Sequence, residues 1–490
     1  MNSKVKIPQK LIDAIEREAC KASFFEFVQS FWSIVIKEDP VYNWHIPFLC
    51  DELQKLAPYI IGRKKKPYDL IINIPPGTTK STIVTIMFPA WLWTQDPTVR
   101  IISNSYSADL SIEHAIKSRD IIISDKYKRL FPEVEIRKDK GQKKAYENTK
   151  TGSRIAASTG GTITGKHAHL ILNDDPLNPA QAASDVERKT SNEHTKTLSS
   201  RKVDKKNTIT ITIMQRLHDE DVTGYLIKKK EDGIRHICLP AELSDRVRPI
   251  EVREKYVNGL LDPVRLSRDV LTEAKIDLGS RGYANQYEQS PSAAGGNIIK
   301  KDWFKTITYP DFIRLRTSEP IIFFGDTGYT EEEQNDPSGF IATCKVGPLL
   351  YITHAHKVLL EFPELVRFVP TYVRSQGYTN TSSLRIEPKA SGKSIVQYLK
   401  KSSDEINVTE TPSPTDSKEV RLTAASPTVE AGRVVLVEGG WNEEFVEEVC
   451  GFPTKPHDEY ADLIGYAVSY HFPNGANDKS NAAKAADYFG

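Results

Sequence analysis

The apolar positions in the first half of the chain alternate between strand-like and helix-like spacing. Continuous or alternating apolar runs predict strands at 70–74, 99–104, 154–157, 169–173 and 208–213. Helical spacing predicts helices at 11–36, 48–56, 80–93 and 108–123. Strands that alternate with helices are typical of a parallel sheet covered by helices. We therefore predict an α/β domain with a mostly parallel sheet over residues 1–240, including an N-terminal helical segment.

The pattern changes beyond residue 300. Three short apolar strands follow one another closely at 321–326, 339–346 and 350–356, and this spacing predicts an antiparallel meander. A further strand is predicted at 384–387. Three helices are predicted, at 362–376, from Ser391 onward and at 463–470. The second half therefore predicts another α/β domain, with a mixed sheet.

The segment between these regions, 241–300, is polar, is interrupted by prolines and ends in a run of small residues. Such composition marks a boundary, so we predict a linker or small subdomain there and a second domain over 301–473. The last residues, 474–490, are polar and rich in Ala, Asn and Lys, which predicts a flexible tail.

The composition narrows the class of protein. A chain of 490 residues is long enough for two domains, and its 39% apolar and 27% charged residues are typical of a globular protein. No apolar run reaches the roughly 18 residues of a membrane span, so we expect a cytoplasmic protein without membrane contact. Five scattered cysteines without C-x-x-C spacing argue against disulfides and a zinc site. The net charge of +1 requires any DNA contact to come from local basic patches such as 63–66.

Candidate chemistry begins where the first predicted strand ends in a Pro-Pro-Gly turn that runs into Lys80 and Ser81. Backbone N–H groups and a helix N-terminus in such a turn face an anion. Lys80 would reach the β- and γ-phosphates of a nucleotide, and Ser81 would ligate Mg²⁺. The predicted nucleotide-binding residues of this turn are Pro76, Gly77, Thr78, Thr79, Lys80, Ser81 and Thr82. The usual pattern G-x-x-x-x-G-K-[ST] has glycine where this chain has Ile74 and Thr79, so a plain turn with a surface lysine is the alternative.

Other residues of the first half complete this candidate site. Asp174 and Asp175 end an apolar strand, where the first would hold Mg²⁺ and the second would orient or deprotonate the attacking water. Asp-Asp-Pro is also an ordinary turn. Gln215 follows the next strand and is placed to read the γ-phosphate. His45 lies in an aromatic cluster upstream of the turn, where it either stacks on adenine or packs in the core.

In the second half, carboxylates stand at the ends of two strands and near the start of the last helix. Asp326 and Glu387 end their strands, and Asp458 and Asp462 at i and i+4 would share one helix face. This arrangement is typical of an RNase H-like nuclease, in which two Mg²⁺ or Mn²⁺ ions activate water and stabilise the leaving oxygen. All four are predicted metal ligands, and Asp326, Glu387 and Asp458 are the predicted catalytic acids. Glu459 ranks below its neighbours as a ligand. Each acid alone would be an ordinary cap, turn former or ion-pair partner.

Taken in order, these motifs resemble the large terminase subunit, the DNA-packaging motor of tailed bacteriophages. In the first half the resemblance is carried by 72–76 with Lys80 and Ser81, 160–165, 174–176, 214–218 and 239–241. In the second half it is carried by 325–326, 386–387, 391–393, 416–421, and 452–453 with 457–458. It spans roughly residues 20–472 in family order.

The resemblance implies an N-terminal P-loop ATPase and a C-terminal RNase H-like nuclease, with ATP and Mg²⁺ as cofactors and Mn²⁺ supporting cleavage. It implies ATP-driven translocation of double-stranded DNA into a procapsid and endonucleolytic cleavage of concatemeric DNA. The implied partners are double-stranded DNA, the small terminase subunit, the portal protein and further copies of the chain in a ring on the portal. A monomer in solution, in the host cytoplasm and outside the mature virion, is expected. The family also places an arginine on the ATP phosphate, for which Arg119 and Arg154 are the candidates.

Two other interpretations stay open at this point. The chain is alternatively a helicase-type translocase with a non-catalytic RNase H-like domain. A capsid or scaffold protein, in which both acidic sites are structural, is the interpretation from a different functional class.

Overall fold

The computed structural model describes residues 8–163, 165–229, 233–291, 297–327, 337–388, 390–402, 406–412, 416–454 and 458–473. The predicted tail at 474–490 lies outside the described residues. The chain divides into two compact units, the first made of Met1–Thr272 and Arg281–Ala294 and the second of Glu273–Ser280 and Gly295–Gly490. Within the described part, no helix combines the length and the apolar character needed to cross a membrane.

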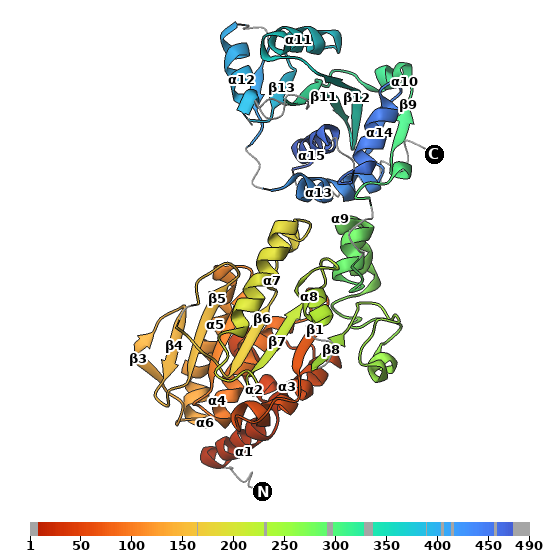
Figure 1. Cartoon of the computed structure of the whole chain (residues 1–490). Coiled ribbons are helices and arrows are strands. Elements are labelled where there is room, and N and C mark those ends of the chain that lie inside the picture. Colours follow the sequence, from red (N-terminus) through yellow and green to blue (C-terminus); the bar gives the residue numbers. More distant parts are fainter. Residues whose placement is uncertain are drawn as a thin grey trace. The chain divides into compact units, whose positions relative to one another are not determined.

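The first unit is built on an eight-stranded sheet in the order β3-β4-β5-β2-β6-β7-β1-β8 (Figure 1). Its strands are β1 (Asp69–Asn73), β2 (Arg100–Ser105), β3 (Ile136–Gly141), β4 (Ala145–Asn148), β5 (Ser153–Ser158), β6 (Leu170–Asp174), β7 (Ile209–Met214) and β8 (Ile234–Cys238). All pairs from β5 to β8 are parallel, and β3 and β4 add antiparallel pairs at one edge. The carboxyl ends of β1, β6 and β7 therefore lie side by side, which is where open α/β sheets bind ligands.

Helices cover both faces of this sheet. Side chains of neighbouring residues in a strand point to opposite faces, and β5 shows where the helices lie. Ile155 packs into a cluster with Leu198 of α7 (Asp185–Ser199). Arg154 points the other way and donates a hydrogen bond to the Thr85 carbonyl of the π-helical segment η1 (Thr82–Met87).

The other helices of the first unit pack around these layers. They are α1 (Gln9–Ala22), α2 (Phe24–Val35), α3 (His45–Ile61), α4 (Phe88–Gln95), α5 (Ala108–Ile123), α6 (Asp125–Leu130), η2 (Pro179–Gln181), α8 (Val222–Lys229) and η3 (Ile250–Lys255). Helix α9 (Arg268–Gln286) carries residues of both units. The helix predicted over 11–36 is two helices, because Ser23 ends the first and its hydroxyl caps the second by accepting the Glu26 N–H.

The second unit is built on a seven-stranded mixed sheet in the order β14-β13-β10-β11-β12-β15-β9. Its strands are β9 (Lys305–Ile307), β10 (Ile322–Asp326), β11 (Ser338–Val346), β12 (Leu349–Val358), β13 (Ser383–Ile386), β14 (Val408–Glu410) and β15 (Val434–Val437). The predicted meander is present, since β10, β11 and β12 are antiparallel, and β13 pairs in parallel with β10. The α/β class, with a mostly parallel first sheet and a mixed second sheet, is confirmed.

Two helical layers sandwich the second sheet. Phe324 of β10 packs into the cluster formed with α13 (Lys418–Glu430), α14 (Asn442–Gly451) and α15 (Glu459–His471). Its neighbour Phe323 packs on the opposite face. The helices of that layer are α11 (Phe362–Ser375) and α12 (Ala390–Ser402), and η4 (Lys301–Trp303) and α10 (Tyr309–Leu315) complete the unit.

The last helix begins later than the acid spacing predicts. Asp458 precedes α15 with non-helical backbone angles (φ −143°, ψ 10°), so it does not share a helix face with Asp462. Six strands also have no counterpart among the predicted elements: the edge strands β3, β8, β9 and β14, and the strands next to an edge, β4 and β15. Most of these strands are short or only partly buried, so their apolar pattern is weak. β15 is different, because its four residues are all apolar and buried and only its shortness hid it.

Asp69 ties the start of β1 to its neighbours in the first unit. Its carboxylate lies 2.8 Å from Lys66 Nζ and 3.5 Å from Lys202 Nζ, and it accepts the Thr210 N–H at 2.8 Å. Burial would raise the pKa of Asp69, but the two lysines and this N–H hold it below its ordinary value. The buried carboxylate therefore stabilises the folded unit.

We expect Asp69→Asn to lower the free energy of unfolding of the first unit by about 3 kcal/mol, because it leaves buried ammonium charge without its partner. The contribution of Asp69 is present above its unfolded pKa and is lost as the pH falls through the lower folded pKa, so wild type and variant should converge in strong acid. Denaturant unfolding at several pH values measures this. Asp219→Asn, which removes an exposed pair with Lys228, is the control and should cost at most about 1 kcal/mol. Equal losses in the two variants would contradict the role given to Asp69.

Candidate nucleotide and metal sites

The predicted phosphate loop connects β1 to η1 at the carboxyl ends of the parallel strands. Gly77 has φ +76° and Thr79 has φ +60°. Glycine adopts such angles freely, whereas another residue pays about 1 kcal/mol or more. Thr79 thus takes the backbone conformation that the second glycine of the usual pattern would supply. Thr78 Oγ1 closes the turn by donating to the Pro75 carbonyl at 2.8 Å, while Pro76 is partly exposed and Thr82 starts η1.

Beyond this turn the structure brings five predicted residues together from three adjacent strands. Lys80 Nζ donates to Gln215 Oε1 at 2.7 Å and lies 3.4 Å from Asp175 Oδ2. Ser81 Oγ donates to Asp174 Oδ1 at 2.9 Å. This grouping contradicts the alternative of a surface lysine, because Lys80 is only 7% exposed.

Buried charges of both signs meet in this group. Burial raises the pKa of Asp174 and of Asp175, against the attraction of Lys80. His114 Nδ1 lies 3.4 Å from Asp174 Oδ2, but burial lowers the pKa of His114 to about 4, so its imidazole is neutral near pH 7. Lys80 is in contact with Asp175, and the charges of Lys80 and Arg154 both act on Asp174. Ser81 and Asp174 are oxygen donors of the kind that Mg²⁺ prefers, so this pair could hold the cation of a bound nucleotide.

His45 lies behind the loop, in the protein interior. It is 0% exposed, its Nε2 lies 3.2 Å from the Thr78 carbonyl oxygen, and its Nδ1 lies 3.0 Å from the Asn43 amide nitrogen. Burial lowers the pKa of His45 to about 4, so the neutral ring can accept from Asn43 and donate to the loop. Of the two predicted alternatives, this position fits core packing, and His45 supports the loop from inside.

The two candidate arginines lie on neighbouring elements, Arg154 on β5 and Arg119 on α5, and the charges of both act on Tyr146. Arg154 is 1% exposed, donates to the Thr85 carbonyl at 2.6 Å, and its charge acts on Asp174. Arg119, on α5, is only partly buried and its charge acts on Tyr146. A contact of either arginine with an ATP phosphate stays a prediction.

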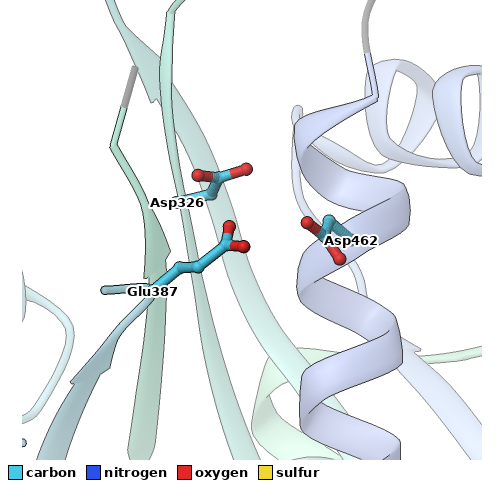
Figure 2. A group of neighbouring side chains, drawn as sticks. All are labelled: Asp326, Glu387 and Asp462. Atoms are coloured by element: carbon cyan, nitrogen blue, oxygen red, sulfur yellow. The ribbon is translucent and has the colours of Figure 1, made fainter. Parts of the chain in front are cut away.

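The second unit brings three carboxylates to one point (Figure 2). Asp326 ends β10, Glu387 follows β13 and Asp462 lies in the first turn of α15, and one oxygen of each lies within 4.8 Å of the others. Figure 2 shows the two acids of the sheet pointing toward the helical one. All three side chains are buried, with exposed fractions of 8%, 0% and 0%.

Backbone pairing fixes the position of Glu387. β13 pairs with β10 in a register that sets Ile386 opposite Gly325, and the Glu387 N–H donates to the Gly325 carbonyl at 3.0 Å. Helix α12 then passes directly over this point, where a Cβ atom on Gly392 would lie 1.9 Å from the Glu387 carbonyl oxygen. Only glycine fits there, which gives a physical reason for the glycine in the 391–393 motif.

Two cations and a tyrosine contact the acid cluster. Arg421 donates through Nε to Asp462 Oδ1 at 2.9 Å, and Tyr466 donates to Glu387 Oε1 at 3.1 Å. Lys418 lies 3.5 Å from Asp326 Oδ2 and 3.7 Å from Asp462 Oδ2. Burial raises the pKa of Asp462, and these cations oppose that effect.

The other predicted acids lie outside this group. Asp458 is partly exposed and pairs with Lys418 at 2.7 Å. Glu459 is buried in a separate ion pair, 2.8 Å from Lys357. Among the described residues, the group that could hold a metal ion is therefore Asp326, Glu387 and Asp462. Carboxylate oxygens are the ligands that Mg²⁺ and Mn²⁺ prefer, so the donor set fits such an ion.

Comparison with known proteins agrees with these two units. Residues 369–471 match the family model of the terminase RNase H-like domain. The large terminase of a thermophilic bacteriophage, solved in complex with ATP-gamma-S, matches with a TM-score of 0.50 and 11% identity, over 85% of this chain and 98% of that one. This chain has the fold of the phage large terminases. The large-terminase resemblance seen in the sequence motifs is thereby confirmed.

Two further solved large terminases are similar over different lengths. The bacteriophage HK97 large terminase matches at 11% identity with a TM-score of 0.37, over 89% of this chain and 92% of that one. The large terminase nuclease of the thermophilic phage G20c with bound magnesium matches at 16% identity with a TM-score of 0.28, over 36% and 98%. The comparison with curated proteins gives no match.

Several residues of the two sites were not predicted from the sequence. His114, Lys418, Arg421 and Tyr466 contact the predicted acids directly. Tyr466 stands four residues after Asp462, so helical spacing could have indicated it. The other three come from helices distant in sequence from the acids they contact. Lys418 and Arg421 belong to the 416–421 motif, but nothing in that motif indicates which acids they contact.

We expect Thr79→Gly to raise the thermal stability of the first unit slightly or leave it unchanged, because glycine removes the cost of a positive φ, about 1 kcal/mol. The same change at Thr82, which has helical backbone, should lower stability by about 1 kcal/mol. Thermal unfolding of both variants beside wild type measures the difference. A Thr79→Gly variant as destabilised as Thr82→Gly would contradict a strained left-handed residue in the loop.

Proposed function

We propose that this chain has the activities of a large terminase as well as its fold: ATP-driven translocation of double-stranded DNA into a procapsid, and metal-dependent endonucleolytic cleavage of concatemeric DNA. The observation that carries the proposal is the presence of two acid-lined centres, one in each unit. The first combines a phosphate loop with Lys80, Ser81 and the acid pair of β6. The second is the buried group of three converging carboxylates.

In the first centre, the chain's own groups would bind and orient Mg·ATP. Lys80 would exchange its contacts with Gln215 and Asp175 for the β- and γ-phosphates, and Ser81 with Asp174 would hold the nucleotide's Mg²⁺. Asp175, freed from Lys80, would orient the attacking water. Gln215 would then contact the γ-phosphate, and this contact would be lost when the phosphate is hydrolysed. The large terminase solved with ATP-gamma-S, whose fold this chain shares, supports this use of the unit.

In the second centre, Asp326, Glu387 and Asp462 would hold divalent metal. Bound Mg²⁺ or Mn²⁺ would supply an activated water and stabilise the leaving 3′-oxygen. Arg421 fixes the Asp462 carboxylate and Tyr466 fixes that of Glu387, so the ligand oxygens are held in place by hydrogen bonds. The match of residues 369–471 to the terminase RNase H-like domain supports a nuclease role for this unit.

The partners follow from this function. Double-stranded DNA would be bound mainly through its phosphates, so binding should weaken steeply with salt and depend little on sequence. The same proposal gives the chain two protein partners, the small terminase subunit and the portal protein. The chain would be a monomer in the host cytoplasm and would assemble into a ring of copies on the portal.

We expect Lys80→Ala to reduce ATP turnover at least about 100-fold, because Lys80 would neutralise charge on the transferred phosphate. Among the described residues, Lys80 is the only cation in hydrogen-bond or ion-pair contact with Asp175 and Gln215. Phosphate release by the purified chain measures turnover. Lys117→Ala, which removes an exposed lysine paired with Glu113, is the control and should turn over normally. Unchanged turnover in Lys80→Ala would refute the nucleotide site and favour a structural capsid or scaffold role.

For the nuclease we expect Asp326→Asn and Asp462→Asn each to reduce plasmid cleavage with Mn²⁺ at least about 100-fold while ATP turnover is kept. Asp458→Asn should cost less, because that carboxylate lies outside the converging group. Gel analysis of nicked and linear plasmid measures cleavage. An Asp326→Asn variant that still cuts DNA, or a wild type that never cuts, would remove the nuclease and favour a helicase-type translocase.

A further inference from the structure

Lys418 places a positive charge inside the candidate metal site. Its ammonium lies 2.7 Å from Asp458 Oδ1, 3.5 Å from Asp326 Oδ2 and 3.7 Å from Asp462 Oδ2. The lysine is the first residue of α13, and its side chain is 25% exposed. A lysine is ordinarily protonated at neutral pH, and here three carboxylates lie within 4 Å of its ammonium group.

Lys418 and Arg421 contact Asp462 in different ways. Arg421 donates hydrogen bonds to Asp462 Oδ1 from two of its nitrogens, Nε and Nη2. Asp462 Oδ2 accepts no hydrogen bond from the described residues, and it lies on the side of the carboxylate that faces Lys418. Arg421 therefore holds the carboxylate from outside, whereas Lys418 lies where the acids converge.

We propose that Lys418 is the resident counter-cation of the metal-free cluster and that a divalent metal ion displaces it. This inference rests on the proposed nuclease function. An ion held by Asp326 and Asp462 would lie within a few ångströms of the ammonium, and like charges at that separation repel strongly in a partly buried site. The two cations therefore exclude each other.

Asp458 provides a place for the displaced ammonium. It is the nearest carboxylate to Lys418, it is not part of the converging group, and its side chain is 35% exposed. The ammonium withdraws toward Asp458 and solvent when metal enters. Asp458 is thus a positioning residue that holds the displaced lysine.

Mn²⁺ binding to the full chain without nucleotide tests this exchange. Lys418→Met should bind Mn²⁺ about tenfold more tightly or better than wild type, because the competing charge is gone. In EDTA the same variant should melt at a lower temperature than wild type, and Mn²⁺ should raise its melting temperature by more. Electron paramagnetic resonance of free Mn²⁺ gives the affinity, and Asp326→Asn reports Mn²⁺ bound elsewhere on the chain.

Lys357→Met is the matched control. It removes a lysine that is also buried among carboxylates, those of Glu448 and Glu459, but outside the converging group. It should lower the melting temperature yet leave the Mn²⁺ affinity at the wild-type value. Lys418→Arg, which keeps the charge, should also bind Mn²⁺ like wild type. If Lys418→Met does not fold, Lys418→Gln gives the same comparison.

The outcomes separate this inference from the proposed function. Equal Mn²⁺ affinity in wild type and Lys418→Met, or weaker binding in the variant, would overturn the displacement while leaving a metal centre. Binding in neither protein above the level of Asp326→Asn would refute the proposed nuclease centre and the inference with it. Tighter binding in Lys418→Met alone supports the exchange.

Discussion

Buried negative charge at the carboxyl ends of strands is the constraint on which both units depend. Transferring a carboxylate from water into the protein is costly unless a cation and hydrogen bonds compensate it. In the first unit Lys80 faces Asp174 and Asp175, and in the second Lys418 and Arg421 face the converging acids. Each site gathers more than one carboxylate around these cations. A bound divalent ion would add the positive charge that compensates the buried carboxylates.

The two units reach this state in different ways. The parallel strands β1, β6 and β7 of the first sheet end at one edge, so residues far apart in sequence meet there without long loops. The second sheet supplies two acids from adjacent strands and the third from a helix laid across them. Strain is also concentrated at the first site, where Thr79 and Asp175 both have positive φ. Such strain persists only where the surrounding structure enforces it.

The sequence predicted the central elements of each unit well. Apolar runs that end in a carboxylate identified β6, β10 and β13, because a central buried strand is apolar throughout and its polar end residue stands out. The same local signal did not identify edge strands or the break at Ser23, where one capping hydroxyl divides the aromatic stripe into two helices. Nor did it place the start of α15, since helical spacing alone put Asp458 inside the helix, whereas Asp458 is the residue before it and has non-helical backbone angles.

The sequence by itself determined which residues carry chemistry: the loop with Lys80 and Ser81, and the acids that end particular strands. It determined them because strand ends and turns are specified by neighbouring residues. Only the tertiary structure decided that Asp462, and not Asp458, converges with Asp326 and Glu387, and that His45 lies under the loop. Only the tertiary structure brought Lys418 into the acid cluster, because strand register and helix packing join residues that no local pattern connects.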